Sequence, residues 1–215
     1  MKLRLGEWIG LLIVLVTFGI GYHYYPNLPE MVASHWNAQG QVDGYTNRFW
    51  GAFLIPTIEV GLFLLLWIIP VIDPKKANIK KFRNSYDIFV VTFLLFLTYL
   101  YLLTINWSLG KHFDMTQYLV PGFAALFFAV GFMVEKSEPN YMIGVRTPWT
   151  LASESVWRKT NVLGGKLFKY ASVIILLGFF VPNYSMWFLL VPIMFLAIFV
   201  VLHSYLIFRS EKEQS

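Results

Sequence analysis

The amino-acid sequence predicts an all-α, polytopic membrane protein with six transmembrane helices and both termini in the cytoplasm. Composition is the first reason: 57% of the 215 residues are hydrophobic and only 13% are charged, whereas soluble domains carry about 25% charged residues. A soluble protein of this length would have too little polar surface to cover its apolar side chains, and a bilayer removes that requirement. The length indicates one integral membrane domain, residues 1–215.

Six apolar runs are the second reason, because about 20 apolar residues are needed to cross a bilayer as a helix. The predicted spans are 8–25, 49–69, 88–109, 118–134, 170–181 and 186–208. The fifth is short unless its helix starts near Leu163, and Pro182 and Asn183 form a tight turn into the sixth. No small-x-small cleavage site follows the first run, so we interpret it as a retained span and not a cleaved signal peptide.

The distribution of Lys and Arg is the third reason, and it predicts the orientation. The two termini and the 71–86 and 136–169 loops carry 15 of the 17 cations, and the other side has only Arg48 and Lys111. Cytoplasmic segments are enriched in Lys and Arg, so this rule accounts for the net charge of +5 without direct binding of nucleic acid. The absence of cysteine excludes disulfides, thiolate zinc sites and cysteine nucleophiles.

Residues 1–70 are predicted to form a front helical hairpin whose outer loop, 26–48, contains the candidate ligand-binding residues. Pro26 and Pro29 end the helix that arrives from the first span. The alternatives are a folded cap, in which polar side chains satisfy backbone groups, and a recognition surface for an extracellular ligand. A metal site was the third interpretation, but no ligand pair has helical i, i+4 spacing and no HExxH motif is present, so no metal or cofactor is predicted. The candidate ligand-binding residues are His35, Asn37, Gly40 and Asp43.

Glu59 is the one acidic residue predicted to lie deep in the membrane. It lies about 15 Å along its helix from the outer end of the second span, and Pro56 precedes it by one turn. Intramembrane acids are rare and often functional. One interpretation is a proton or cation site, and the other is a carboxyl group hydrogen-bonded to another span. Pathways for protons or cations normally contain several such groups, which weakens the first interpretation.

The loop 136–169 contains a polar, basic segment with two tryptophans. Pro148 disfavours a helical conformation at Thr147, and Thr150 or Ser153 can cap an amphipathic helix that continues through Trp157 and Arg158. The alternatives are an interfacial helix with basic anchors and a docking surface for a soluble partner. The candidate docking residues are Gly144, Arg146, Thr147, Pro148, Trp149, Trp157 and Arg158.

These segments resemble the SdpI-type immunity proteins of bacteria over most of the chain. The front part resembles the small membrane domain of unknown function that often precedes the SdpI domain, through His35-Trp36-Asn37, Gly40 and Asp43. The rear part, residues 87–208, resembles the four-helix SdpI domain. The residues that carry this second resemblance are Asn140, the segment Gly144-Val-Arg-Thr-Pro-Trp-Thr150, Trp157 and the pair Gly164-Gly165.

The resemblance implies a non-enzymatic, multi-pass protein of the bacterial plasma membrane that gives immunity to a secreted toxic peptide. It also implies signal transduction, in which the toxin-bound protein recruits a cytoplasmic transcriptional repressor of the ArsR type to the membrane. The outer loop would then be the sensor and the inner loop the docking surface. The alternatives from the residues alone are a small transporter or membrane metalloenzyme centred on Glu59, and a structural or envelope-stress membrane protein.

Overall fold

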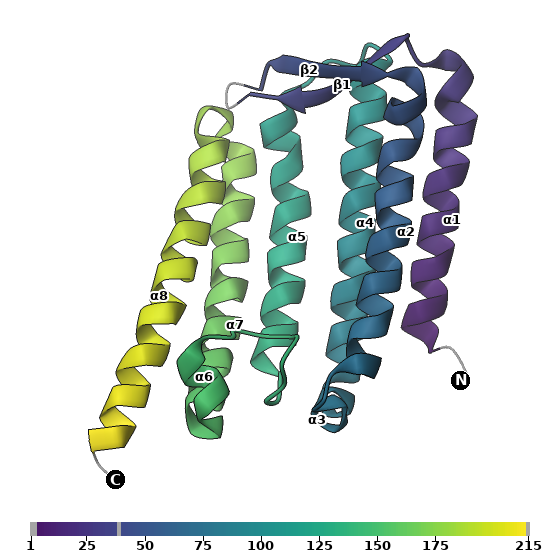
Figure 1. The fold of residues 1–215 in the computed structure, drawn as a ribbon. Coiled ribbons are helices and arrows are strands. Elements are labelled where there is room, and N and C mark those ends of the chain that lie inside the picture. The colour runs from purple at the N-terminus through teal and green to yellow at the C-terminus, as the bar shows by residue number, and fades with distance from the viewer. Residues whose placement is uncertain (1–3, 38–39, 214–215) are drawn as a thin grey trace.

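The computed structural model describes residues 4–37 and 40–213 as six long helices capped at one end by a β-hairpin (Figure 1). All six helices are long and apolar enough to cross a membrane, which confirms the number of spans. They are α1 (Leu5–Tyr24), α2 (Arg48–Ile72), α4 (Arg83–Ser108), α5 (Met115–Glu135), α7 (Glu154–Leu177) and α8 (Ser185–Glu213). Two short helices, α3 (Lys76–Lys81) and α6 (Pro148–Ala152), lie at the end opposite the hairpin.

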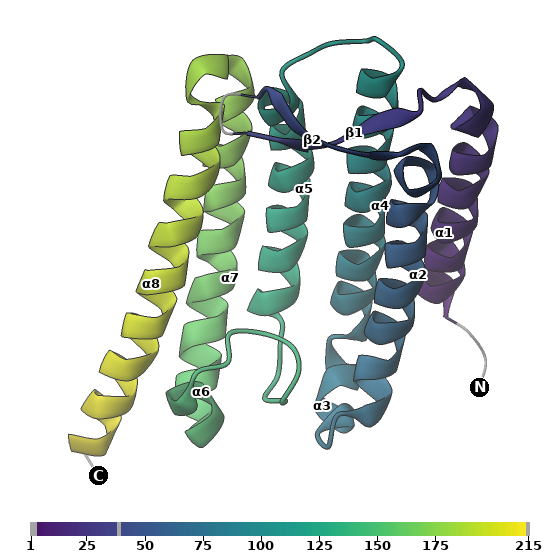
Figure 2. The same ribbon diagram turned by 45° about the horizontal axis from the view of Figure 1, so that its top comes forward.

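The hairpin corrects the expectation of an all-α fold. Strands β1 (Met31–Trp36) and β2 (Val42–Asn47) pair antiparallel within the predicted outer loop. Side chains on β2 alternate between half-buried and exposed, which is the pattern of a strand with one face on a core. The hairpin lies across the ends of the helices and thereby covers apolar groups that a flexible loop would leave open (Figure 2).

The start of the fifth long helix is a second correction. Helix α7 begins at Glu154, 16 residues before the predicted span at Tyr170, so the expected amphipathic helix and the span are one continuous helix. Of the two predicted caps, Thr150 and Ser153, the cap is Ser153, since its hydroxyl accepts a hydrogen bond from the backbone N–H of Val156 at 3.3 Å. The loop predicted for 136–169 is therefore reduced to a short connection, α6 and the first turns of α7.

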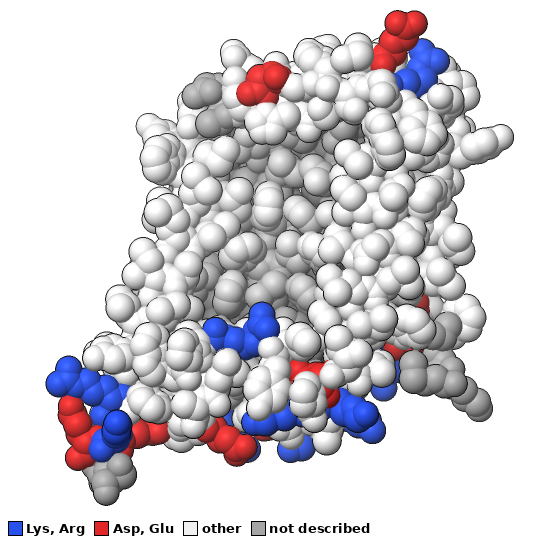
Figure 3. Space-filling view, in the orientation of Figure 1, with Lys and Arg blue, Asp and Glu red and all other residues white. Residues whose placement is uncertain are grey.

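The six long helices form two groups of three. Helices α1, α2 and α4 make the front triad, and α5, α7 and α8 make the rear triad, with α4 packed against α5 between them (Figure 1). The start of α1 and the end of α8 lie at the same end of the bundle, opposite the hairpin. We call the two ends the basic end and the hairpin end, because Lys and Arg gather at the former (Figure 3).

Two prolines within α2 are compensated by tyrosines of α4. Proline lacks the N–H that would bond to the carbonyl four residues earlier, so Pro56 frees the Ala52 carbonyl and Pro70 frees that of Leu66. The Tyr101 hydroxyl donates to the Ala52 oxygen at 2.7 Å and the Tyr86 hydroxyl donates to the Leu66 oxygen at 2.6 Å. Because an unsatisfied carbonyl in a bilayer costs several kcal/mol, these bonds keep α2 helical and attach it to α4.

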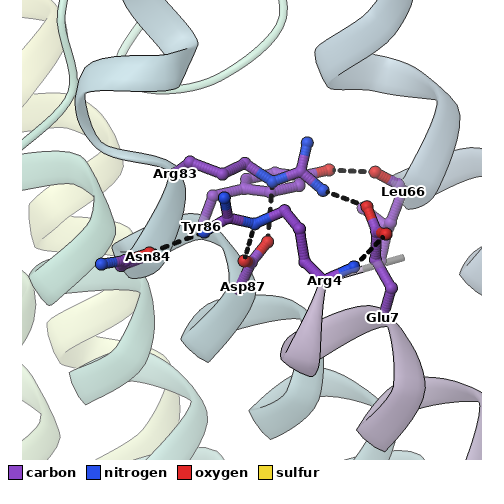
Figure 4. Close-up of polar contacts among 7 residues, drawn as sticks. All are labelled: Arg4, Glu7, Leu66, Arg83, Asn84, Tyr86 and Asp87. Carbon is purple, nitrogen blue, oxygen red and sulfur yellow. Dashed lines mark hydrogen bonds and ion pairs between the residues drawn. The ribbon is translucent and has the colours of Figure 1, made fainter. Parts of the chain in front are cut away.

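An ion-pair network joins α1 to α4 at the basic end (Figure 4). Arg83 donates to Glu7 at 2.8 Å and to Asp87 at 2.7 Å. Arg4 donates to the other oxygen of Asp87 at 2.8 Å and to Asn84 at 2.7 Å. Two guanidinium groups thus face two carboxylates in balanced charge, and the largely buried pair of Arg83 with Glu7 anchors the start of α1.

Helices α5 and α7 make the most extensive helix contact, and glycines permit it. A Cβ atom at Gly165 would lie 2.5 Å from the Cβ of Glu135, and one at Gly131 would lie 2.6 Å from the carbonyl oxygen of Gly165. Small residues let membrane helices approach closely, so that van der Waals packing can hold them together. Lys169 of α7 pairs with Glu135 of α5 beside this contact.

We expect Gly165→Ala to destabilise the protein and Gly164→Ala to be tolerated. The first methyl group would overlap the backbone of Glu135, and overpacking of this kind costs about 1–3 kcal/mol. The second would lie 3.5 Å from the side chains of Val145 and Val200, which is ordinary contact. Thermal unfolding of the two purified variants in the same detergent measures the difference, and equal midpoints would contradict the close approach of α5 and α7.

Candidate functional site

The hairpin packs directly on the end of the front triad. Val32 and Ala33 of β1 are buried, and Val32 lies against Gly51 of α2, where a Cβ atom would come within 2.6 Å of it. Leu28 joins Val32 in an apolar cluster with the buried side chains of Ala52, Tyr101 and Ile105. The absence of a side chain at Gly51 therefore sets how closely the hairpin approaches α2.

Trp36 ends β1 and points toward the bundle. Its ring meets that of Trp107 of α4 edge to face at a centroid distance of 5.8 Å, and Trp107 contacts His112 at 4.5 Å. The indole nitrogen of Trp36 is buried and has no hydrogen-bond partner among the described residues. A buried indole N–H usually finds an acceptor, so this one is available to a bound molecule.

A cavity of about 340 Å³ lies beneath the hairpin, between the two triads. We call it the hairpin cavity. Its walls come from α2, α4, α5 and α8 and its roof from both strands, and the space-filling view is hollowed between the triads below the hairpin (Figure 3). The lining is apolar at depth and polar near the strands. It includes Trp36, Leu54, Tyr101, Thr104, Leu119 and Met186.

The four predicted outer-loop residues separate into two pairs with different surroundings. Asn37 and Gly40 shape the hairpin turn: the Asn37 side-chain oxygen accepts from the Gln41 N–H at 3.0 Å, and Gly40 has a φ of +74°, which favours glycine. His35 and Asp43 are hydrogen-bonded to each other on the exposed side of the hairpin, with side chains 70% and 45% exposed. His35 and Asp43 are therefore accessible to a ligand in the solvent at the hairpin end.

No group of three or more His, Asp or Glu side chains suited to a metal ion occurs in residues 4–37 and 40–213. The exposed pair of His35 and Asp43 supplies two groups of the required type, whereas zinc sites in proteins use three or four protein ligands. The part of the chain that the structure describes therefore offers no assembled position for the membrane metalloenzyme considered above.

Glu59 is fully buried where α1, α2 and α4 meet. One carboxyl oxygen accepts from the Thr98 hydroxyl at 3.1 Å, and the Thr98 and Thr17 hydroxyls lie 2.9 Å apart. The other oxygen has no hydrogen-bond partner among the described residues. Both threonine hydroxyls also donate to carbonyls of their own helices, so the hydrogen-bonded group links α1, α2 and α4 inside the bundle.

The motif after α5 folds into a short loop held by two buried asparagines. The Asn140 side-chain oxygen accepts from the N–H groups of Met142 and Ile143 at 2.9 and 2.6 Å. The Asn161 oxygen accepts from the Val145 N–H at 2.7 Å. These bonds replace backbone partners that a loop lacks, so the loop has one well-defined shape.

Gly144 lies where this loop turns onto α7. Its φ is +110°, and a Cβ atom there would lie 2.7 Å from the Asn161 side-chain oxygen. Trp157 closes the same space from α7: its side chain is 0% exposed and its indole N–H donates to the Ser137 carbonyl at 3.1 Å. Gly144 therefore shapes the loop and Trp157 supports it from inside. This corrects the docking prediction for Trp157, because a fully buried ring cannot touch a soluble partner.

The other predicted docking residues are divided between interior and surface. Thr147 is buried, caps α6 and donates to the Ser204 hydroxyl of α8 at 3.0 Å. Trp149 is half-buried against Tyr205, with ring centroids 5.1 Å apart. The residues with exposed side chains are Arg146, Pro148 and Arg158.

Three features of the structure were not predicted from the sequence. Asp73, at the end of α2, is buried and its carboxylate accepts from the Tyr141 N–H at 2.9 Å, which ties the front triad to the loop. Asn161 lies on α7, 16 residues after Val145, and supports the loop by accepting a hydrogen bond from the Val145 N–H. Asp73 has a recognisable sequence signal, because an Asp-Pro pair after an apolar run marks the end of a helix. The hairpin cavity has none, because side chains from four helices form it.

We expect Asn161→Ala to loosen the loop, because the Val145 N–H would lose its acceptor. An unsatisfied buried donor costs about 1–3 kcal/mol, which should increase tryptic cleavage after Arg146 about fivefold or more by opening the loop more often. Val162→Ala, at the exposed neighbouring position, is the matched control. Equal cleavage of the two variants would show that Asn161 does not hold the loop.

Comparison with known proteins adds two family matches and one relative. Residues 12–60 match a domain of unknown function (DUF1648), and residues 136–204 match the SdpI/YfhL protein family. The immunity protein SdpI of Bacillus subtilis (strain 168) is 25% identical over 198 residues, which cover 92% of this chain and 93% of that protein. No solved structure matches the chain. The first match includes the hairpin, the second includes the asparagine-supported loop, and neither includes α4.

Proposed function

We propose that this chain, which joins a DUF1648 domain to an SdpI/YfhL family domain, protects a bacterial cell from a secreted toxic peptide. It is a distant homologue of an immunity protein over nearly its whole length, and that homology is not to an enzyme family. The proposed activity is therefore binding, without a catalytic step. The six apolar helices are consistent with a multi-pass protein of the plasma membrane.

The proposed orientation has the basic end in the cytoplasm and the hairpin end outside. The charge difference between the ends supports it, because Arg48 and Lys111 are the cations near the hairpin and the other described Lys and Arg residues belong to segments at or near the basic end. Cytoplasmic segments of membrane proteins are enriched in these residues. In this orientation, the hairpin is the first part of the chain that a secreted peptide meets.

The hairpin cavity is the observation on which the proposed toxin site rests. Ligand sites are usually concave and apolar, with a few polar groups that orient the ligand. The cavity has apolar walls within the membrane and the unpartnered Trp36 indole N–H near its roof. A hydrophobic segment of a peptide would bury its side chains between the triads, and one of its backbone carbonyls would accept from Trp36.

The exposed side of the hairpin supplies the polar part of the proposed toxin site. His35 and Asp43 are exposed above the cavity roof and can contact groups of the peptide that remain in water. Bound in this way, the peptide is held at the immunity protein and kept from the surrounding lipid. Protection then depends on the number of immunity proteins relative to the number of toxin molecules, as expected for a stoichiometric binder.

We expect Leu54→Trp to abolish protection by filling the hairpin cavity. Leu54 lines the cavity, whereas Leu65 lies on the same helix, is 53% exposed and does not line it, so Leu65→Trp is the control. Spent medium of the parent strain supplies the toxin, and the indicator cells lack this gene and express each variant at equal membrane abundance. Survival should fall by at least about tenfold for Leu54→Trp, the effect of about 1.4 kcal/mol of lost binding. Full protection by Leu54→Trp would exclude the cavity as the toxin site.

We also propose that the exposed part of the loop motif docks a cytoplasmic repressor of the ArsR type. The supporting observation is the rigid support described above: Arg146 donates to the Tyr141 carbonyl at 2.7 Å and lies on a loop whose backbone is fixed by Asn140 and Asn161. A fixed surface lowers the entropy cost of binding. The exposed side chains of Arg146, Pro148 and Arg158 then form a small, preorganised surface for the repressor.

We expect Arg146→Glu to release the repressor while protection from the toxin is kept, because the two sites lie at opposite ends. The measurement is the membrane-bound fraction of a fluorescently tagged ArsR-type repressor from the same organism. Lys80→Glu, an equal charge change on the exposed side of α3, is the control. An unchanged membrane-bound fraction in Arg146→Glu would contradict docking at this loop.

A further inference from the structure

Helices α7 and α8 enclose a groove whose chemistry changes along its length. Near the basic end, a hollow of about 550 Å³ is lined by Arg158, Lys159 and Lys166, together with His203 and apolar side chains of both helices. Further toward the hairpin end, a hollow of about 480 Å³ is lined by apolar and aromatic side chains alone, among them Leu167, Ile174, Val191 and Phe195.

The two hollows lie on one face of the helix pair. On α7, the lining positions 159, 163, 166, 170 and 174 follow each other in steps of three or four, which places them on the same side of a helix. On α8, the positions 192, 196, 203 and 207 follow a similar rule. The two hollows therefore adjoin along α7, where Lys166 lines the basic one and Tyr170, one turn later, lines the apolar one. The apolar hollow extends about 12 Å beyond Lys166 to the level of Ile174, at 1.5 Å per residue.

The cations at the basic end of the groove are only weakly engaged by the protein. Lys159 pairs with Glu211 at 2.7 Å and Arg158 with Glu138 at 3.4 Å, and both basic side chains are more than half exposed. Exposed pairs of this kind contribute little to stability. Lys166 has no ion pair among the described residues, so it is a free positive charge at the point where the groove becomes apolar.

We propose that the α7–α8 groove binds one anionic phospholipid from the leaflet at the basic end. Its phosphate lies between Lys166 and the two neighbouring cations, and one acyl chain follows the apolar stretch past Leu167 and Ile174. A phospholipid matches the groove along its length, because its charged phosphate lies at the membrane interface and its hydrocarbon chains extend toward mid-membrane. A second copy in the same orientation would instead bring the Lys and Arg side chains of its own basic end to these cations, whereas a phosphate supplies the opposite charge. The site is separate from the hairpin cavity, and it does not depend on toxin binding.

Native mass spectrometry of the full chain in detergent tests this proposal. The probes are phosphatidylglycerol and phosphatidylcholine with identical acyl chains, titrated separately. We expect one phosphatidylglycerol to remain bound at concentrations where phosphatidylcholine does not. Equal binding of the two lipids would overturn the assignment of an anionic headgroup, and lipid-free dimers as the main species would identify a second copy as the occupant.

Matched variants locate the binding. Arg158→Gln, Lys159→Gln and Lys166→Gln combined should weaken phosphatidylglycerol binding by about fivefold for each cation removed. Lys76→Gln, Lys80→Gln and Lys81→Gln combined removes the same charge from α3 at the same end and should leave that binding unchanged. Lys166→Gln alone loses no ion pair among the described residues, so it should keep the fold and still weaken binding about fivefold. Equal effects of the α3 and α7 combinations, or no effect of Lys166→Gln, would show that the lipid does not bind in the groove.

Discussion

The hydroxyl of Tyr101, bonded to the Ala52 carbonyl, is the interaction on which the hairpin end depends. Pro56 frees this carbonyl within the membrane, where water is absent to satisfy it. With the bond in place, α2 continues as a helix beside α4 and presents Gly51 and Ala52 to the hairpin. Val32 then packs on Gly51, and Tyr101 itself lines the hairpin cavity. One hydrogen bond thus connects helix integrity, the hairpin platform and the proposed toxin site.

At the basic end, buried polar side chains hold a loop in one shape, and the charged side chains of that loop remain exposed to solvent. Asn140, Asn161 and Trp157 satisfy backbone groups of the loop, while Arg146 remains exposed. Asp73 ties the same loop to the front triad. Recognition of a peptide and docking of a soluble partner are therefore proposed at opposite ends of the bundle, and any coupling between them must pass through the helices.

Features that depend on local sequence signals were predicted, whereas features that depend on contacts between distant segments were not. Apolar runs and the Ser153 cap are local signals, and both correctly predicted features of the fold. The hairpin was missed because its strands are short and lie in a segment rich in turn residues. The continuity of the amphipathic helix with the fifth span was not predicted, because the apolar run begins only at Tyr170. Close packing of Gly165 on Glu135 joins the two parts to α5 as one helix. Trp157 looked like a surface residue because nothing local showed the loop that covers it.

The sequence by itself determined that six segments are long and apolar enough to cross a membrane as helices, since hydrophobicity and length are properties of each segment alone. It also determined the charge difference between the two sides and carried the motifs that resemble a known family. Only the tertiary structure decided which motif residues are buried and which are exposed, and it alone created the hairpin cavity and the α7–α8 groove. The physical reason is that burial and cavity shape depend on side chains from helices that are distant in sequence and meet only when the bundle packs.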